Sequence, residues 1–127
     1  MTHTPAFPIV WTEIPVTDMD AARRFYEPVF GWEMTLNTEG PNDMLVFPYD
    51  DKSGVAGHLY PGTPAKGGST THLVIPDKLE DAISRVWDAG GTVLEIPPVE
   101  MPFGRFAYAL DPDGNSIGLF EPAAKAA

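Results

Sequence analysis

The sequence predicts an α+β fold made of two tandem βαβββ modules, and an internal repeat is the main reason. The stretch from Trp11 to Gly31 returns as Thr70 to Gly90 at a constant offset of 59 residues. Each copy reads as a strand, an Asp-started helix and a glycine stop, and three further strand-like segments follow each helix. Internal repeats fix architecture. A period close to half of the 127 residues therefore indicates two fused copies of one module.

The first module is predicted over about residues 7–61. Residues 8–16 are rich in Ile, Val, Trp and Thr, which is typical of a strand. Asp18 suits a helix N-cap, and Gly31 suits a left-handed helix stop. Apolar residues at three- and four-residue spacing give this helix one buried face: Ala22, Phe25, Tyr26, Val29 and Phe30. The remaining strands are expected at residues 32–37, 44–49 and 55–60.

The second module is predicted over about residues 70–122, after a Gly- and Pro-rich linker of about residues 62–69. Asp77 and Glu80 have the form of a capping box at the start of its helix, and Gly90 ends the helix. The buried helical face is expected to hold Leu79, Ala82, Ile83, Val86 and Trp87. Strands are expected at residues 70–75, 92–96, 105–110 and 116–121, with a turn at 111–115 and a frayed tail from residue 123.

One helix per four-stranded sheet covers a single sheet face. The other face must curl around a ligand cavity or pack on a partner subunit. By length the whole chain, residues 1–127, is expected to form one domain.

The charge balance excludes some partners. Eight basic and eighteen acidic residues give a net charge of −10, and nucleic-acid binding depends on clustered Lys and Arg. The acidity either attracts a cationic ligand or simply keeps the protein soluble. No apolar run approaches the roughly 18 residues that span a bilayer. No secretory signal is visible, so a cytoplasmic location is the default expectation, with neither nucleic acid nor membrane as a partner.

Two signatures resemble those of the vicinal oxygen chelate superfamily, which includes glyoxalase I, extradiol dioxygenases, fosfomycin-resistance enzymes and bleomycin-resistance proteins. The opening one is Ile14-Pro-Val-Thr-Asp18 with Arg24-Phe-Tyr26 and Val29-Phe-Gly-Trp32; the closing one is Leu110-Asp-Pro-Asp-Gly-Asn115 with Ile117-Gly-Leu119. The segments Val55-Ala-Gly-His-Leu-Tyr60 and Gly104-Arg-Phe106 resemble a glyoxalase-related bacterial branch. The resemblance covers essentially the whole chain and implies the glyoxalase/bleomycin-resistance/dioxygenase fold, with curved mixed sheets enclosing a cavity. It implies less about function, because one fold hosts many chemistries.

The metal-using relatives place His, Gln or Glu at two positions of each module, around a divalent metal. By resemblance these positions are Trp11 and Gly57 in the first module, and Thr70 and Gly118 in the second. Tryptophan and glycine side chains do not ligate metals, and threonine is a poor neutral ligand. No cofactor is therefore expected, and a divalent metal is expected only at a relocated site.

Glu13 and His72 occupy the same position in the two copies. Side chains two apart on a strand share a face, so Glu13 points with Trp11 and His72 with Thr70. If these positions line a cavity, a carboxylate and an imidazole converge there. They could then act as general base and acid or begin a relocated metal site. The alternative is a structural polar pair, or two groups that contact separate waters.

Several other residues are candidates for a ligand site. Arg105 could clamp a carboxylate or phosphate, or it pairs with an acidic neighbour. Aromatic residues could wall a planar ligand: Trp11, Trp32, Phe47, Phe103 and Tyr108. His58 follows Gly57 and is expected on the opposite strand face, at the surface or an interface. Glu121 is expected at an exposed strand end, or within reach of a relocated metal.

Two function hypotheses follow. The first is a glyoxalase-like small-molecule-binding protein that lacks the usual metal ligands and holds a small or planar ligand in an aromatic-lined cleft. The second is a divergent enzyme, a lyase, isomerase, epimerase or dioxygenase-related protein, that uses Glu13 and His72 or a relocated metal. Glyoxalase I activity itself is not expected. A purely structural domain ranks last, and the resemblance implies a homodimer.

Overall fold

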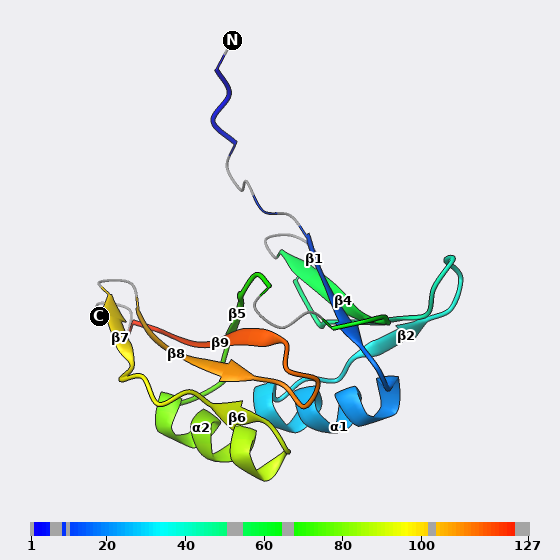
Figure 1. The fold of residues 1–127 in the computed structure, drawn as a ribbon. Helices are drawn as coiled ribbons and strands as arrows, with labels where there is room; N and C mark the ends of the chain where they lie inside the picture. The colour runs from blue at the N-terminus through cyan, green and yellow to red at the C-terminus, as the bar shows by residue number, and fades with distance from the viewer. Residues whose placement is uncertain are drawn as a thin grey trace.

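The computed structural model describes residues 2–5, 9, 11–50, 55–64, 68–101 and 104–123. Two sheets lie side by side, and the two helices pack against each other on one side of both (Figure 1). The predicted α+β architecture of two mixed sheets is confirmed.

The first sheet has the strand order β1-β4-β3-β2, with β1 parallel to β4 and the other neighbours antiparallel. The elements of the first module are β1 (Trp11–Val16), α1 (Met19–Phe30), β2 (Thr35–Asn37), β3 (Met44–Val46) and β4 (Ala56–Pro61). The predicted strands are therefore present in the predicted order, and β2 and β3 are shorter than expected.

The second sheet repeats this order as β5-β9-β8-β6, and β5 is parallel to β9. Its elements are β5 (Thr71–Val74), α2 (Leu79–Asp88), β6 (Thr92–Val93), β7 (Val99–Met101), β8 (Gly104–Leu110) and β9 (Ser116–Pro122). The sequence analysis missed β7, a three-residue strand on β8. It follows Pro97 and Pro98, which are typical of loops.

The first helix starts and stops as its sequence predicts. The Asp18 carboxylate accepts hydrogen bonds from the backbone N–H groups of Asp20 (2.9 Å) and Ala21 (3.1 Å). Gly31 ends the helix with φ of 71°, a left-handed conformation that glycine adopts without strain.

The second helix corrects two predictions. Asp77 is not the N-cap; its carboxylate binds both terminal nitrogens of Arg85 at 2.8 Å. Lys78 takes the N-cap position without a side-chain cap, because the repeat offset has grown by one residue where the helix begins. Trp87 is 54% exposed. Successive residues turn about 100° around a helix, so Trp87 lies well off the stripe of Leu79 and Val86.

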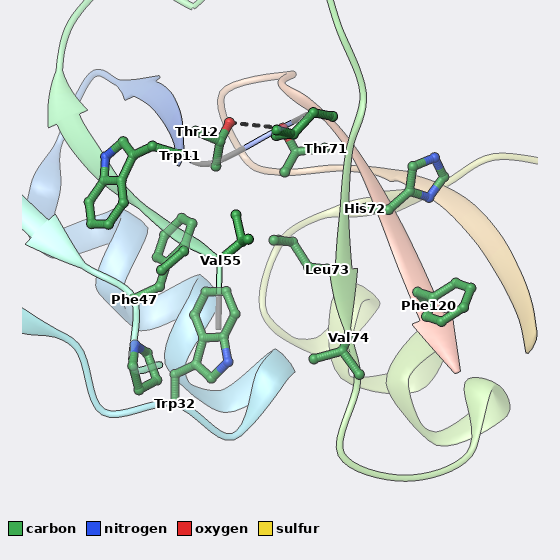
Figure 2. A pocket seen from close by; sticks show the side chains of 13 residues that line it. Trp11, Thr12, Trp32, Phe47, Val55, Thr71, His72, Leu73, Val74 and Phe120 are labelled. Carbon is green, nitrogen blue, oxygen red and sulfur yellow. Dashed lines mark hydrogen bonds between the residues drawn. The ribbon is translucent and has the colours of Figure 1, made fainter. Parts of the chain in front are cut away.

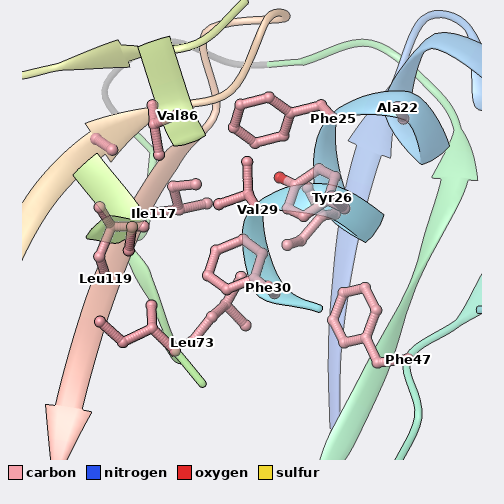
Figure 3. Close-up of a cluster of buried hydrophobic side chains, with 14 of the residues drawn as sticks. Ala22, Phe25, Tyr26, Val29, Phe30, Phe47, Leu73, Val86, Ile117 and Leu119 are labelled. Atoms are coloured by element: carbon pink, nitrogen blue, oxygen red, sulfur yellow. The ribbon is translucent and has the colours of Figure 1, made fainter. Parts of the chain in front are cut away.

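The aromatic face of α1 fills the space between the two sheets (Figure 3). Phe25, Tyr26, Val29 and Phe30 are all buried there. The Tyr26 hydroxyl donates to the buried Asp111 carboxylate at 2.8 Å, and the Asn115 amide donates to the Pro15 carbonyl at the same distance. The predicted turn at residues 111–115 therefore also joins the second module to the first.

Within the described residues, no helix is long and apolar enough to cross a membrane.

Candidate functional site

The two strand faces of β1 have different roles. Ile14 and Val16 are buried against the core, whereas Trp11 and Glu13 point to the opposite, open face of the sheet. This alternation follows from the two-residue period of a strand. Trp11 is 41% exposed, so the open face of the first module carries an accessible indole beside a carboxylate.

The larger pocket, which we call the intermodule pocket, lies between the two modules and has a volume of about 500 Å³. Figure 2 shows Trp11 at one side of it and His72 at the other. Its walls are mainly aromatic and aliphatic: Trp11, Trp32, Phe47 and Val55 from the first module, and Leu73, Val74 and Phe120 from the second. Trp32 and Phe47 lie against each other with ring centroids 4.6 Å apart.

Two threonines contribute polar groups to this mainly apolar pocket. Thr12 and Thr71 both line it, and their Oγ1 atoms lie 3.4 Å apart (Figure 2). They are 59 positions apart in the sequence, so they are equivalent residues of the two modules. The repeat offset could have revealed this pair, but the sequence analysis did not single it out.

His58 connects the open face of β4 to Trp11 and Glu13. The Trp11 Nε1–H donates to His58 Nδ1 at 2.9 Å, and His58 Nε2 lies 3.3 Å from Glu13 Oε1. Because an indole nitrogen is a donor and never an acceptor, His58 Nδ1 must be the accepting atom. The hydrogen bond therefore assigns the neutral tautomer, with the His58 proton on Nε2, the nitrogen that lies near Glu13.

The location of His58 corrects the prediction of a surface histidine. It is 5% exposed. The strand register pairs Glu13 with His58 and Thr12 with Gly57. His58 therefore shares the open face with Glu13, whereas Gly57 belongs to the other face. The sequence analysis had assigned Gly57 to the face of Trp11, which inverted the parity.

A smaller pocket of about 340 Å³ lies over this part of the first sheet. We call it the Glu13 pocket. It is lined by Glu13, Pro41, Asn42, Met44, His58 and Tyr60. Trp11 lines the intermodule pocket and binds His58, which lines the Glu13 pocket. One side chain thus links the two cavities.

The structure does not bring Glu13 and His72 together within one protomer. His72 lies on the second sheet, against the rings of Phe106 (centroids 4.8 Å apart) and Tyr108 (5.9 Å). Its imidazole covers Gly118, where a Cβ atom would overlap the ring. Glu13 instead contacts His58.

Arg105 is engaged by acidic neighbours, the second of its two sequence readings. Its guanidinium donates to Glu80 at 2.7 Å and to Glu121 at 2.9 Å. These contacts raise the pKa of Arg105, through Glu121 first and then Glu80, and Arg105 in turn lowers the pKa of both carboxyls. Glu121 also accepts from the Leu79 N–H at 2.7 Å and so caps α2. This role corrects the expectation of an exposed strand end.

The other aromatic candidates fall in different places. Phe47 is buried and lines the intermodule pocket. Tyr108 contacts His72 and Phe106 on the open face of the second sheet. Phe103 lies outside the described residues.

The positions that hold a metal in relatives do not fit one in this chain. Trp11 offers an indole that is already bound to His58, and the Thr70 and Ser116 hydroxyls bond each other at 2.5 Å. Gly57 and Gly118 offer no side chain. In the described part of the chain, His, Asp and Glu residues form no group of three or more that could hold a metal ion. These donors do not suit a divalent ion.

The sequence and the fold are both similar to known proteins. A family model described as Glyoxalase/Bleomycin resistance protein/Dioxygenase superfamily matches residues 8–119. A Mycobacterium bovis protein named "Putative glyoxylase CFP32" is 27% identical over 118 residues, which are 87% of this chain and 44% of that protein. The chain thus spans less than half the length of this curated relative.

Solved structures share the fold. A glyoxalase/bleomycin resistance protein from Albidiferax ferrireducens superposes with a TM-score of 0.68 at 21% identity, covering 89% of this chain and 97% of the other. A superfamily member from Sphaerobacter thermophilus gives 0.60 at 27% identity, covering 89% and 95%. A glyoxalase-related enzyme from Fulvimarina pelagi gives 0.63 at 19% identity, covering 89% and 86%.

Proposed function

The chain belongs to the Glyoxalase/Bleomycin resistance protein/Dioxygenase superfamily, and from this premise we propose that it binds a small planar molecule between its two modules. The observation that carries the proposal is the intermodule pocket of about 500 Å³, with aromatic walls and few polar groups. Ligand sites typically have this volume range and this composition.

The lining favours a ligand with a flat apolar body and one hydrogen-bonding group. Trp11, Trp32 and Phe47 offer ring surfaces, which pack well against other rings. The hydroxyls of Thr12 and Thr71 can donate and accept hydrogen bonds, and His72 offers a further polar group in the lining. Among the described residues that line the pocket there is no lysine or arginine, so these residues suit an uncharged ligand better than an anion.

Metal-independent binding is part of the proposal, because the donors at the family's metal positions do not suit a divalent ion. A homodimer is also proposed. The open sheet faces carry the exposed apolar side chains of Trp11 and Val74, and the exposed Tyr49 ring lies against Trp11; a second copy would cover them. Light scattering coupled to size-exclusion chromatography measures the mass; a monomer at micromolar concentration would contradict the dimer.

The binding proposal is tested with two probes that share one skeleton. 2-Naphthol is planar and decahydro-2-naphthol is not, and both are uncharged at neutral pH. We expect saturation-transfer NMR to show binding of 2-naphthol and weaker binding of its saturated counterpart. Equal signals for the two probes would contradict a planar site.

Two tryptophan substitutions locate the site. Val74 lines the intermodule pocket and is 53% exposed, whereas Ile96 is 50% exposed and outside the lining. Val74→Trp should fill the pocket and abolish the 2-naphthol signal, and the matched Ile96→Trp should leave it unchanged. Binding that survives in Val74→Trp would place the ligand elsewhere.

A second candidate function is an enzyme, a lyase, isomerase or epimerase in which Glu13 acts as the base. The favouring observation is the contact of Glu13 Oε1 with His58 Nε2, 3.3 Å apart, at the Glu13 pocket. A positioned carboxylate can abstract a proton, and His72 would serve as acid only from another protomer. Glu13→Gln should abolish turnover of a carbonyl substrate without loss of folding. Retained turnover would remove Glu13 from that role.

A further inference from the structure

Among the described residues, the Trp11 indole makes one hydrogen bond, and this bond depends on the protonation of its acceptor. Its indole ring is 41% exposed, and it lies on β1, an edge strand of the first sheet. Apart from an edge-on contact with Tyr49, its ring contact is with His58, whose Nδ1 accepts the indole N–H at 2.9 Å. The position of this wall of the intermodule pocket is therefore tied to His58.

A proton on His58 conflicts with that bond. The imidazolium carries N–H groups on both nitrogens, so Nδ1–H would point at the indole N–H and the hydrogen bond would be lost. His58 Nε2 would still lie 3.3 Å from Glu13 Oε1, and the neutral contact would become an ion pair. Protonation thus exchanges the hydrogen bond from Trp11 for an ion pair with Glu13.

The surroundings of His58 contain one carboxylate among uncharged groups. The His58 side chain is buried, 5% exposed, and Glu13 Oε1 lies 3.3 Å from its Nε2. Tyr60 on β4 contacts the ring, β3 places the uncharged Val46 beside His58, and Asn42 and Met44 complete the pocket. Among the described residues, Glu13 is the charged side chain in contact with His58.

We propose that His58 is a proton-operated latch on Trp11. Neutral His58 holds the indole as a wall of the intermodule pocket. Protonated His58 pairs with Glu13 and releases the indole, so the pocket loses a wall. Acidification then weakens ligand binding; this consequence, unlike the latch itself, rests on the proposed binding function.

The state of the hydrogen bond between Trp11 and His58 can be measured without any ligand. The three tryptophans of the chain give separate indole N–H signals in ¹⁵N-labelled protein, and Trp11→Phe assigns one of them to Trp11. We expect this signal to move upfield as the pH falls across the range in which imidazoles titrate, about 8 to 5. In His58→Gln, whose amide oxygen can accept the bond but does not titrate, the signal should stay still.

A second histidine variant separates the effect of His58 from that of His72. His72→Gln removes the imidazole in the intermodule pocket and should leave the pH response of the Trp11 signal intact. Should His58→Gln not fold, His58→Asn serves instead, because its amide oxygen can also accept the indole hydrogen bond and does not titrate.

The effect of pH on ligand binding is measured with 2-naphthol. Its affinity should fall several-fold on acidification in the wild type and in His72→Gln, and stay constant in His58→Gln. A pH-invariant Trp11 signal in the wild type, or an unchanged titration in His58→Gln, overturns the latch. A titrating Trp11 with no 2-naphthol binding at any pH leaves the latch standing and refutes the proposed function instead.

Discussion

Thr12 and Thr71 face each other where the two modules meet, with their hydroxyl oxygens 3.4 Å apart. Each module contributes the same residue of its first strand, so the contact lies on the pseudo-twofold relation between the repeats. The pair is partly buried and contributes two hydroxyl groups to the mainly apolar intermodule pocket.

A double-mutant cycle should show this coupling. Thr12→Val leaves the Thr71 hydroxyl without its partner, and we expect a loss of up to about 1 kcal/mol in the free energy of unfolding. Thr71→Val should cost a similar amount. The double substitution should be close to neutral, because no unpaired hydroxyl remains. Urea unfolding measures all three; strictly additive losses would show that the hydroxyls are not coupled.

The Tyr26–Asp111 bond should make stability sensitive to alkaline pH. Burial first, and the Asp111 charge second, raise the pKa of Tyr26 well above its usual 10.0. A raised pKa favours the folded protein fully below the unfolded value and loses this contribution as the pH rises above it. The unfolding free energy should therefore fall more steeply above about pH 10 in the wild type than in Tyr26→Phe.

At neutral pH the same substitution should cost about 1.5–3 kcal/mol, the range for hydrogen bonds to charged groups. Tyr49→Phe is the matched control, because Tyr49 is 49% exposed. Equal alkaline slopes for the wild type and Tyr26→Phe would mean that Tyr26 is not protected in the fold.

The Glu121 cap should make the start of α2 less stable at acid pH. Hydrogen bonds from Arg105, and then from the Leu79 N–H, lower the pKa of Glu121. A lowered pKa stabilises the fold above the unfolded value, and the contribution disappears as the pH falls through the folded value. Hydrogen exchange at Leu79 should accelerate on acidification, and Glu121→Gln should show faster exchange already at neutral pH. The exposed Glu100 offers the control Glu100→Gln, which should leave Leu79 unchanged.

The sequence predicted the elements from local signals, but the contacts of the site depend on register. Asp18, Gly31 and the repeat itself carry their information within a few residues or at one fixed offset. The bond from Trp11 to His58 joins residues 47 apart in the sequence, and the register of β1 on β4 determines it. A one-residue shift reverses which face a side chain occupies, and this shift explains the error at His58.

The second module shows the same limit. The repeat offset grows by one residue between β5 and α2, which moves the N-cap from Asp77 to Lys78. Glu121 then caps the helix from β9, 42 residues away in the sequence. No local pattern encodes such a long-range cap.

The metal content of the purified protein tests the proposal that ligand binding is independent of a metal. We expect elemental analysis of protein prepared without added metal to find Ni, Zn, Mn and Fe well below one ion per chain. Treatment with EDTA should leave the Tm unchanged, because no structural metal is removed. A stoichiometric metal, or a fall in Tm after chelation, would reveal a relocated site, and Glu13→Gln together with His58→Gln would then test whether these two residues hold it.

Gly118 should fix the position of His72. A Cβ at residue 118 would overlap the imidazole, and because His72 is an exposed side chain at the pocket rim it can swing away. Gly118→Ala should therefore change stability little, while the His72 ring leaves Phe106 and Tyr108 and its proton signals lose their aromatic ring-current shifts. In a His72→Ala background, Gly118→Ala should leave the NMR signals of Phe106 and Tyr108 unchanged. An unmoved His72 spectrum in Gly118→Ala would show that the ring does not rest on residue 118 in solution.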